Sequence, residues 1–262
     1  MNNIKNCSIC GASYSQYKEG QDYSEHWCEL PTKCAEVKGV CQFCNPKSSC
    51  YTPFVEVIMC SYSRPERLPL IKDMLSKQTY KRFKFTVVDN TVDNKGSAER
   101  FKAVAKVKGD VIIFIDDDES PEPDFIEYMV SQYDPKCIKS WFTRIFKSES
   151  YWDSMAYSPE GTEVDYAGTG GMILSRKIFD ENPELYDIPE EFAKVEDLFL
   201  SYLGRERGLK IMAVTPHIKI EVDGNDQFKK LGYYKEEAFR KLRLDGWKLL
   251  KDYENNDSTT NG

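Results

Sequence analysis

From about residue 53 onward, short apolar runs alternate with amphipathic stretches. VEVIMCSY is followed by LPLIKDMLSKQ, FKFTVVDN, SAERFKAVAKVKG and DVIIFIDDD. Short apolar runs are typical of buried strands, and apolar residues spaced by three and four are typical of helices. The order therefore predicts βαβαβ, which forms a mostly parallel sheet with helices on both faces. Ligands of such sheets bind beyond the carboxyl ends of the strands.

The pattern continues with further helices. Ser120-Pro121 is interpreted as the N-cap and first residue of a helix that runs through Met129. A less regular, aromatic-rich stretch follows over 141–166. A second clear helix is predicted from about Glu190 to Arg207, and LKIMAVTP after it is interpreted as a strand.

Composition divides the chain near Pro53. Seven of the nine cysteines fall in the first 50 residues, where aliphatic residues are few. We therefore predict a Cys-rich module over 1–52, a catalytic domain over 53–232, and a C-terminal helix with a disordered tail over 233–262. A chain of 262 residues with 40% hydrophobic content can bury one substantial core and a small satellite.

The cysteine spacing in the N-terminal module predicts structural zinc. Cys7-x-x-Cys10 and Cys41-x-x-Cys44 form two chelating pairs, the arrangement that supplies four thiolates to a tetrahedral zinc ion. The module holds four further donors: His26, Cys28, Cys34 and Cys50. Eight donors suit one or two zinc ions, and the spacing leaves the ligand pairing open. The alternative is a disulfide framework, which requires an oxidising compartment. Cys60 and Cys137 are isolated and are predicted to be small core residues.

Charge and hydropathy exclude several classes of protein. The net charge is −7, with acidic and basic residues interspersed, so nothing global favours nucleic-acid binding. No apolar run approaches the roughly 20 residues of a membrane span, and the start of the chain lacks the features of a signal peptide. These features predict a cytoplasmic protein without a membrane span.

The strongest chemical signal is the acidic cluster in DVIIFIDDDESPEPDFIE. Carboxylates packed together repel one another unless a cation neutralises them, and oxygen ligands suit Mg²⁺ or Mn²⁺. The alternative is a solvated acidic loop that caps the next helix. The position of the acidic cluster directly after an apolar strand favours a metal site.

NKGSAERFKAVAKVKGDVIIFIDDDE resembles the central signature of inverting GT-A glycosyltransferases, with Gly96-Ser97-Ala98, Arg100, Gly109-Asp110 and the D-x-D cluster in family order. The resemblance extends from Phe54 to about His217. It implies a GT-A fold and a metal-dependent enzyme that moves a sugar from a nucleoside diphosphate sugar to an acceptor hydroxyl with inversion.

The resemblance also implies roles for single residues. Asp118 would ligate the cation, and Asp116 would face the ribose or the metal's outer shell. Asp117 occupies a position that the motif leaves free, so a solvated and a functional role both stay open. The other residues implied at the nucleotide are Ser61, Tyr62, Arg64, Arg100 and Asp89, the last of which would bind the base.

Two further segments complete the resemblance. YAGTGGMILSRKIF is similar to the family's glycine-rich acceptor loop followed by a strand, and VEDLFLSYLGRERG to its E-D element at the start of a helix. Asp197 would be the general base, although a carboxylate at a helix N-terminus is also a favourable dipole interaction. His217 is either a further metal ligand or a structural histidine.

The acceptor stays open at this level. Candidates are a hydroxylated DNA base, as some phage glycosyltransferases modify in the host cytoplasm, or a glycan or protein. Aromatic residues suited to stacking on sugars or bases, or to core packing, are Trp141, Phe142, Phe146, Tyr151, Trp152 and Tyr157. The alternative functions are a sugar-phosphate nucleotidyltransferase and a non-catalytic zinc-dependent binding protein. The oligomeric state is not predicted.

Overall fold

The structure, a computed structural model, describes residues 4–6, 13–15, 52–221 and 230–257. Its centre is a six-stranded sheet with the strand order β12-β7-β11-β5-β3-β4. The strands are β12 (Lys210–Ala213), β7 (Cys137–Ser140), β11 (Met172–Ser175), β5 (Val111–Ile115), β3 (Val55–Ser61) and β4 (Phe83–Asp89). β3 pairs in parallel with β4 and β5, and β12 in parallel with β7, whereas β11 is antiparallel to both neighbours. The predicted α/β class with a mostly parallel sheet is confirmed.

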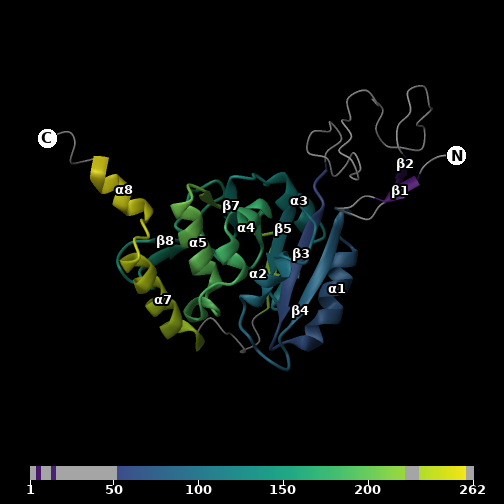
Figure 1. The fold of residues 1–262 in the computed structure, drawn as a ribbon, viewed down its shortest axis with the longest axis horizontal. Helices are drawn as coiled ribbons and strands as arrows, with labels where there is room; N and C mark the ends of the chain where they lie inside the picture. Colours follow the sequence, from purple (N-terminus) through teal and green to yellow (C-terminus); the bar gives the residue numbers. More distant parts are fainter. Residues whose placement is uncertain (1–3, 7–12, 16–51, 222–229, 258–262) are drawn as a thin grey trace, which may run out of the picture.

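Helices cover both faces of this sheet (Figure 1). They are α1 (Leu68–Ser76), α2 (Glu99–Val104), α3 (Phe125–Ser131), α4 (Lys177–Glu181) and α5 (Glu196–Glu206). On one face α1 and α3 pack against alternate residues of β3 and β5, and on the other α2, α4 and α5 pack against the intervening residues. The side chains of β5 are buried on both faces, as its unbroken apolar run VIIFI requires.

The predicted helix start at Ser120-Pro121 is wrong. These residues belong to a short strand, β6 (Glu119–Pro121), which pairs antiparallel with β13 (Ile218–Ile220). The helix α3 begins only at Phe125. The local pattern suits a helix cap, but pairing with a strand almost a hundred residues away fixes an extended backbone here.

The later helices also differ from prediction. A 3₁₀ turn at Glu190–Phe192 precedes α5, which begins at Glu196. The single tail helix is two helices, α7 (Gly232–Leu244) and α8 (Leu250–Asp257), and α8 extends into the predicted disordered tail. The break lies at Gly246, whose φ of 105° suits only glycine, and at the fully buried Trp247.

The aromatic-rich stretch forms a second, smaller sheet with the order β10-β8-β9. Its strands are β8 (Thr143–Phe146), β9 (Ser154–Ala156) and β10 (Tyr166–Ala167). Phe146, Tyr151 and Tyr166 pack with Phe239 of α7 and with Trp247. This third apolar cluster holds α7 against α5 and β8, at the end of the molecule far from α1 (Figure 1).

The proposed zinc donors lie outside the described residues. Of the N-terminal module, β1 (Ile4–Asn6) and β2 (Ser13–Ser15) are described, and they pair antiparallel. Cys60 and Cys137 are buried free thiols, as predicted for core residues. Within the described ranges, no helix combines the length and apolar character needed to cross a membrane.

Candidate active site

One cavity of about 690 Å³ opens beyond the carboxyl ends of three neighbouring parallel strands. Tyr62 and Arg64 follow β3, Asn90 follows β4, and the acidic cluster Asp116–Asp118 follows β5. Asp197 at the start of α5 lines the same cavity. This is the edge at which parallel α/β sheets bind ligands.

Asp117 is buried and fastens the loop after β3. Its Oδ2 accepts a hydrogen bond from the Tyr62 amide at 2.9 Å, and its Oδ1 pairs with Nη1 of the buried Arg64 at 3.2 Å. Arg67 adds a bond from Nε to the Asp117 carbonyl at 2.9 Å. Of the two roles left open by the sequence, the solvated one is wrong, since Asp117 shapes the loop that lines the cavity.

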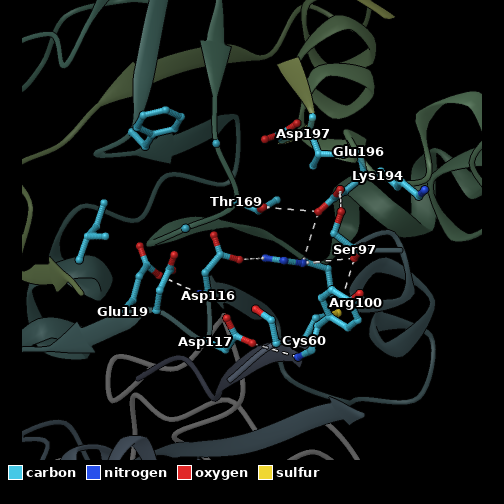
Figure 2. A pocket seen from close by; sticks show the side chains of 18 of the residues that line it. Cys60, Ser97, Arg100, Asp116, Asp117, Glu119, Thr169, Lys194, Glu196 and Asp197 are labelled. Carbon is cyan, nitrogen blue, oxygen red and sulfur yellow. Dashed lines mark hydrogen bonds and ion pairs between the residues drawn. The ribbon is translucent and has the colours of Figure 1, made fainter. Parts of the chain in front are cut away.

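Arg100 joins the acidic cluster to the E-D element. Its guanidinium lies between two carboxylates (Figure 2), with Nη1 2.7 Å from Asp116 Oδ1 and Nε 3.3 Å from Glu196 Oε1. Burial alone would lower the pKa of Arg100, but Asp116 and Glu196 outweigh burial and raise it. Glu196 also accepts a hydrogen bond from Ser97. Burial raises the pKa of Glu196 to about 7, opposed by Arg100 and reinforced by Asp197.

Gly170 makes room for the acidic cluster. A β-carbon at this position would meet Glu119 Oε1 at 2.6 Å and Asp116 Oδ2 at 3.0 Å. Glu119 is buried and cannot move aside easily, because it accepts from the Asp116 amide at 2.8 Å and from Trp141 Nε1 at 3.3 Å. Burial and the neighbouring Asp116 hold the pKa of Glu119 well above its usual range.

Asp118 is the carboxylate best suited to a cation. Its side chain is 30% exposed, and its nearest cationic neighbour is Arg64 Nη1 at 3.7 Å. Burial and the charge of Asp116 raise the pKa of Asp118 to about 6. A carboxylate with this excess of negative charge around it gains from a divalent cation.

Asp197 stands on the other side of the cavity. Its Oδ1 accepts a hydrogen bond from the amide of Leu198 at 2.9 Å. Its Oδ2 accepts a hydrogen bond from the hydroxyl of Tyr166. Burial and the carboxylate of Asp197 raise the pKa of Tyr166 well above its usual range, so the phenol keeps its proton and donates it. The carboxylate is therefore held in one orientation while it stays in contact with the cavity.

Aromatic side chains form a wall of the cavity. Tyr157 has an unusual φ of 59°, and its ring stacks on Trp141 at 5.9 Å with 12° between the planes. Phe142 meets both rings edge-on. Of the predicted aromatic set, Trp141, Phe142 and Tyr157 line the cavity, and the buried Phe146 and Tyr151 belong to the core.

Three of the expected site residues do not line the cavity. Ser61 is buried at the end of β3, and Asp89 turns its carboxylate to the amide and hydroxyl of Thr91, at 2.9 and 2.6 Å. His217 stacks on Tyr128 at 3.9 Å and pairs with Asp124 at 3.2 Å. His217 therefore does not line the cavity that contains Asp118, and its role as a metal ligand stays a prediction.

The cavity also contains residues that sequence reasoning missed, foremost Glu119, Arg144 of β8 and Lys235 of α7. Glu119 directly follows the D-x-D cluster and could have been noticed. Arg144 and Lys235 are distant in sequence from every motif, and tertiary packing alone brings them here.

Part of the chain matches a known family. Residues 57–181, which include the acidic cluster, match the model of Glycosyl transferase family 2. The Glucosyl-dolichyl phosphate glucuronosyltransferase of Haloferax volcanii is 25% identical, and the match covers 54% of this chain and 53% of that protein. The chain thus spans about half the length of this curated relative.

A solved structure with a TM-score above 0.5 shares the fold. The mannosyltransferase PcManGT from Pyrobaculum calidifontis has a TM-score of 0.53 and 13% identity, covering 78% of this chain and 67% of that chain. S. aureus TarS has a TM-score of 0.48 and 15% identity, covering 69% and 38%. The family that matches residues 57–181 and the curated relative are both glycosyltransferases, and PcManGT shares the fold.

Proposed function

We propose that the protein is a metal-dependent, inverting glycosyltransferase that moves a sugar from a nucleoside diphosphate sugar to an acceptor hydroxyl. The observation that carries this proposal is that Asp116 and Asp118 share one cavity with Asp197. Arg100 pairs with both Asp116 and Glu196, the residue before Asp197, so ion pairs connect the acidic cluster to the element that carries the candidate base.

The carboxylates of the acidic cluster suit a divalent cation that is bound jointly by the protein and by the phosphates of the donor. No group of three or more His, Cys, Asp or Glu side chains in the described ranges forms a ready-made metal site. In nucleotide-binding enzymes such as kinases and polymerases, Mg²⁺ is held by one or two carboxylates together with substrate phosphates. Asp118 would hold the cation, with Asp116 beside it, and the cation would neutralise charge on the departing diphosphate.

Asp197 is proposed as the general base. The acceptor hydroxyl attacks the anomeric carbon, its proton passes to Asp197, and the bond to the diphosphate breaks with its electron pair on the leaving oxygen. A single displacement of this kind inverts the anomeric centre. Tyr166 keeps the Asp197 carboxylate in place for this step. A positioned base of this type contributes about 10²- to 10⁴-fold to rate.

Tyr62, Arg64 and Arg100 are proposed to lie near the nucleotide, because all three line the cavity on the side of the acidic cluster. PcManGT, which has the same fold, is described in complex with GDP-Man and Mn²⁺. We therefore propose a similar pair of ligands for this protein, without choosing the base or the sugar.

Titration calorimetry with several nucleoside diphosphates, with and without Mn²⁺, tests this function. We expect at least one of them to bind, and Mn²⁺ to strengthen binding tenfold or more. Asp118→Ala should abolish the Mn²⁺ effect, whereas Asp93→Ala, at an exposed position on another loop, should not. Failure of every nucleoside diphosphate to bind in the presence of Mn²⁺ would contradict the proposal.

The remaining expectations rest on the sequence. We propose that residues 1–52 form a module that binds one or two structural zinc ions. Residues 53–232 are proposed as the catalytic domain, and residues 233–262 as the C-terminal segment that follows it. The acceptor is proposed to be a hydroxylated DNA base or a glycan, and mass spectrometry of nucleosides and glycans from expressing cells distinguishes them. A cytoplasmic location, including that of a phage protein in its host, stays a prediction.

A further inference from the structure

One aromatic residue of the cavity wall is held in a strained conformation. Tyr157, which directly follows β9, has a φ of 59° and is the one non-glycine residue with a positive φ among the residues that the structure describes. Such a backbone costs free energy for a tyrosine and persists only where its surroundings fix it. The buried Thr143 of β8 fixes it here. Its carbonyl accepts a hydrogen bond from the Tyr157 amide at 3.2 Å, and its Oγ1 accepts one from the Ser158 amide at 3.2 Å.

Core packing does not account for this strained tyrosine. Tyr157 is 61% exposed and lines the cavity, whereas Phe146 and Tyr151 from the same part of the chain are almost completely buried. A tyrosine that served the core would be buried in the same way. Strained residues cluster where a protein holds a ligand, and an aromatic ring offers a large flat surface for one. The exposed ring therefore points to a ligand contact.

The glycine-rich segment 168–171 makes room for the other two rings of the wall. A β-carbon on Gly168 would meet Cδ1 of Phe142 at 2.5 Å, and one on Gly171 would meet Cδ1 of Trp141 at 2.5 Å. Each ring thus packs directly on a glycine backbone. The fold gives up two side chains to set the aromatic wall close behind the cavity.

The aromatic wall reaches from the acidic cluster to the candidate base. At one end, Nε1 of Trp141 donates to Glu119 at 3.3 Å, next to the acidic cluster. At the other end, the Phe142 ring meets the Tyr166 ring edge-on at 6.2 Å, and Tyr166 donates to Asp197. A ring that stacks on this wall would lie beside the place where the proposed sugar transfer occurs.

The strand order separates the aromatic wall from the strands that carry the nucleotide side of the cavity. Trp141 and Phe142 follow β7, which lies beyond β11 on one side of β5. Tyr62 and Asn90 follow β3 and β4, on the other side of β5. The acidic cluster follows β5 and lies between the two sides. The wall therefore borders the place left for the acceptor.

We infer that Tyr157, supported by Trp141 and Phe142, is the platform on which a sugar ring of the acceptor stacks, and that the acceptor is a saccharide. This inference rests on the proposed function, since it takes Asp197 to mark the acceptor side. The C–H face of a sugar ring is apolar and packs on an aromatic ring, while the hydroxyls at its edge stay available to Asp197.

A nucleic acid is the other acceptor with rings that stack, and the charge of the wall argues against it. Nucleic acids bind through clustered Lys and Arg side chains that neutralise their phosphates. Residues 141–166, which carry the wall, hold five acidic and two basic residues: Glu149, Asp153, Glu160, Glu163 and Asp165 against Arg144 and Lys147. This excess of negative charge favours a neutral saccharide.

Saturation-transfer-difference NMR on the whole protein tests the inference, with Mg²⁺ and the nucleoside diphosphate that calorimetry identifies. The probes are methyl β-D-glucopyranoside, methyl β-D-galactopyranoside, methyl α-D-mannopyranoside and a single-stranded oligonucleotide that contains 5-hydroxymethylcytosine. We expect at least one glycoside to bind. Saturation should be strongest at the C–H protons of one face of its ring, because that face lies on Tyr157.

Tyr157→Asn removes the ring and tolerates the positive φ, which asparagine adopts more easily than tyrosine. The Kd of the favoured glycoside should rise about tenfold. The urea midpoint and the affinity for the nucleoside diphosphate should not change, because relief of strain offsets the lost contact with Trp141. Tyr157→Phe keeps the ring and should keep the wild-type Kd. Tyr253→Asn, at an exposed tyrosine of α8, is the matched control and should bind as the wild type does.

A wild type that binds none of the glycosides, or that binds the oligonucleotide more tightly than each of them, would overturn the inference. An unchanged glycoside Kd in Tyr157→Asn would overturn it too, and a lower urea midpoint in that case would assign Tyr157 to packing. Weaker binding of the nucleoside diphosphate in Tyr157→Asn would assign the ring to the donor. These outcomes leave the proposed function intact, which fails instead if the wild type binds no nucleoside diphosphate with Mn²⁺.

Discussion

Replacing Asp117 should destabilise the protein far more than replacing an exposed aspartate. In Asp117→Ala the Tyr62 amide loses its acceptor at 2.9 Å, and Arg64 loses a partner at 3.2 Å. Breaking a buried ion pair costs about 3–5 kcal/mol. Asp118 stays 3.7 Å from Arg64 and offsets part of the lost ion-pair stabilisation. We therefore expect the free energy of unfolding to fall by about 2–3 kcal/mol.

Urea denaturation of the wild type and the variant measures this loss. Asp93→Ala is the control, because Asp93 pairs with Lys95 at 3.5 Å between side chains that are 76% and 61% exposed. Exposed pairs contribute about 0–1 kcal/mol. The reasoning is refuted if Asp117→Ala unfolds within about 0.5 kcal/mol of the wild type.

Three further predictions concern the site and the N-terminal module. Gly170→Ala should cost about 1–3 kcal/mol through overpacking and weaken nucleoside diphosphate binding at least tenfold in calorimetry. Gly208→Ala strains a backbone with a φ of 72° but places its β-carbon in open space, so it should leave binding unchanged. The pKa of Glu196 rises from 4.5 to about 7 on folding, so the wild type should lose up to roughly 3 kcal/mol of stability as pH rises across that window. Urea denaturation at pH 5 and pH 8 measures this loss, which should be smaller in Glu196→Gln than in the wild type. An equal change in the free energy of unfolding between the two pH values in both proteins would contradict the assignment. Elemental analysis should find one or two zinc ions per chain, and a metal-free protein would exclude zinc in residues 1–52.

The sequence was most informative where chemistry follows an element directly. The apolar run of β5 leads into Asp116–Asp118, and that order alone placed the acidic cluster at the carboxyl edge of the sheet. The start of α5 at Glu196 similarly carries the E-D element. Neighbours in sequence keep their relation in the fold, so such motifs can be recognised without coordinates.

Relations between distant segments could not be read in this way. Ser120-Pro121 looks like a helix start until its partner strand β13 is known. Lys235 lies on a helix whose polar pattern is typical of a solvated surface, yet packing against β8 buries it next to Tyr151. The environment of Asp117 likewise depends on a loop more than fifty residues earlier.

The most direct test of the central claim is the behaviour of Asp197→Asn. The amide keeps the size of the side chain and an oxygen that can accept the bond from Tyr166, but it cannot take a proton from the acceptor. We predict that the variant binds the nucleoside diphosphate and Mn²⁺ as the wild type does, while the rate of sugar transfer falls about 10²- to 10⁴-fold. Transfer at the wild-type rate would contradict the account.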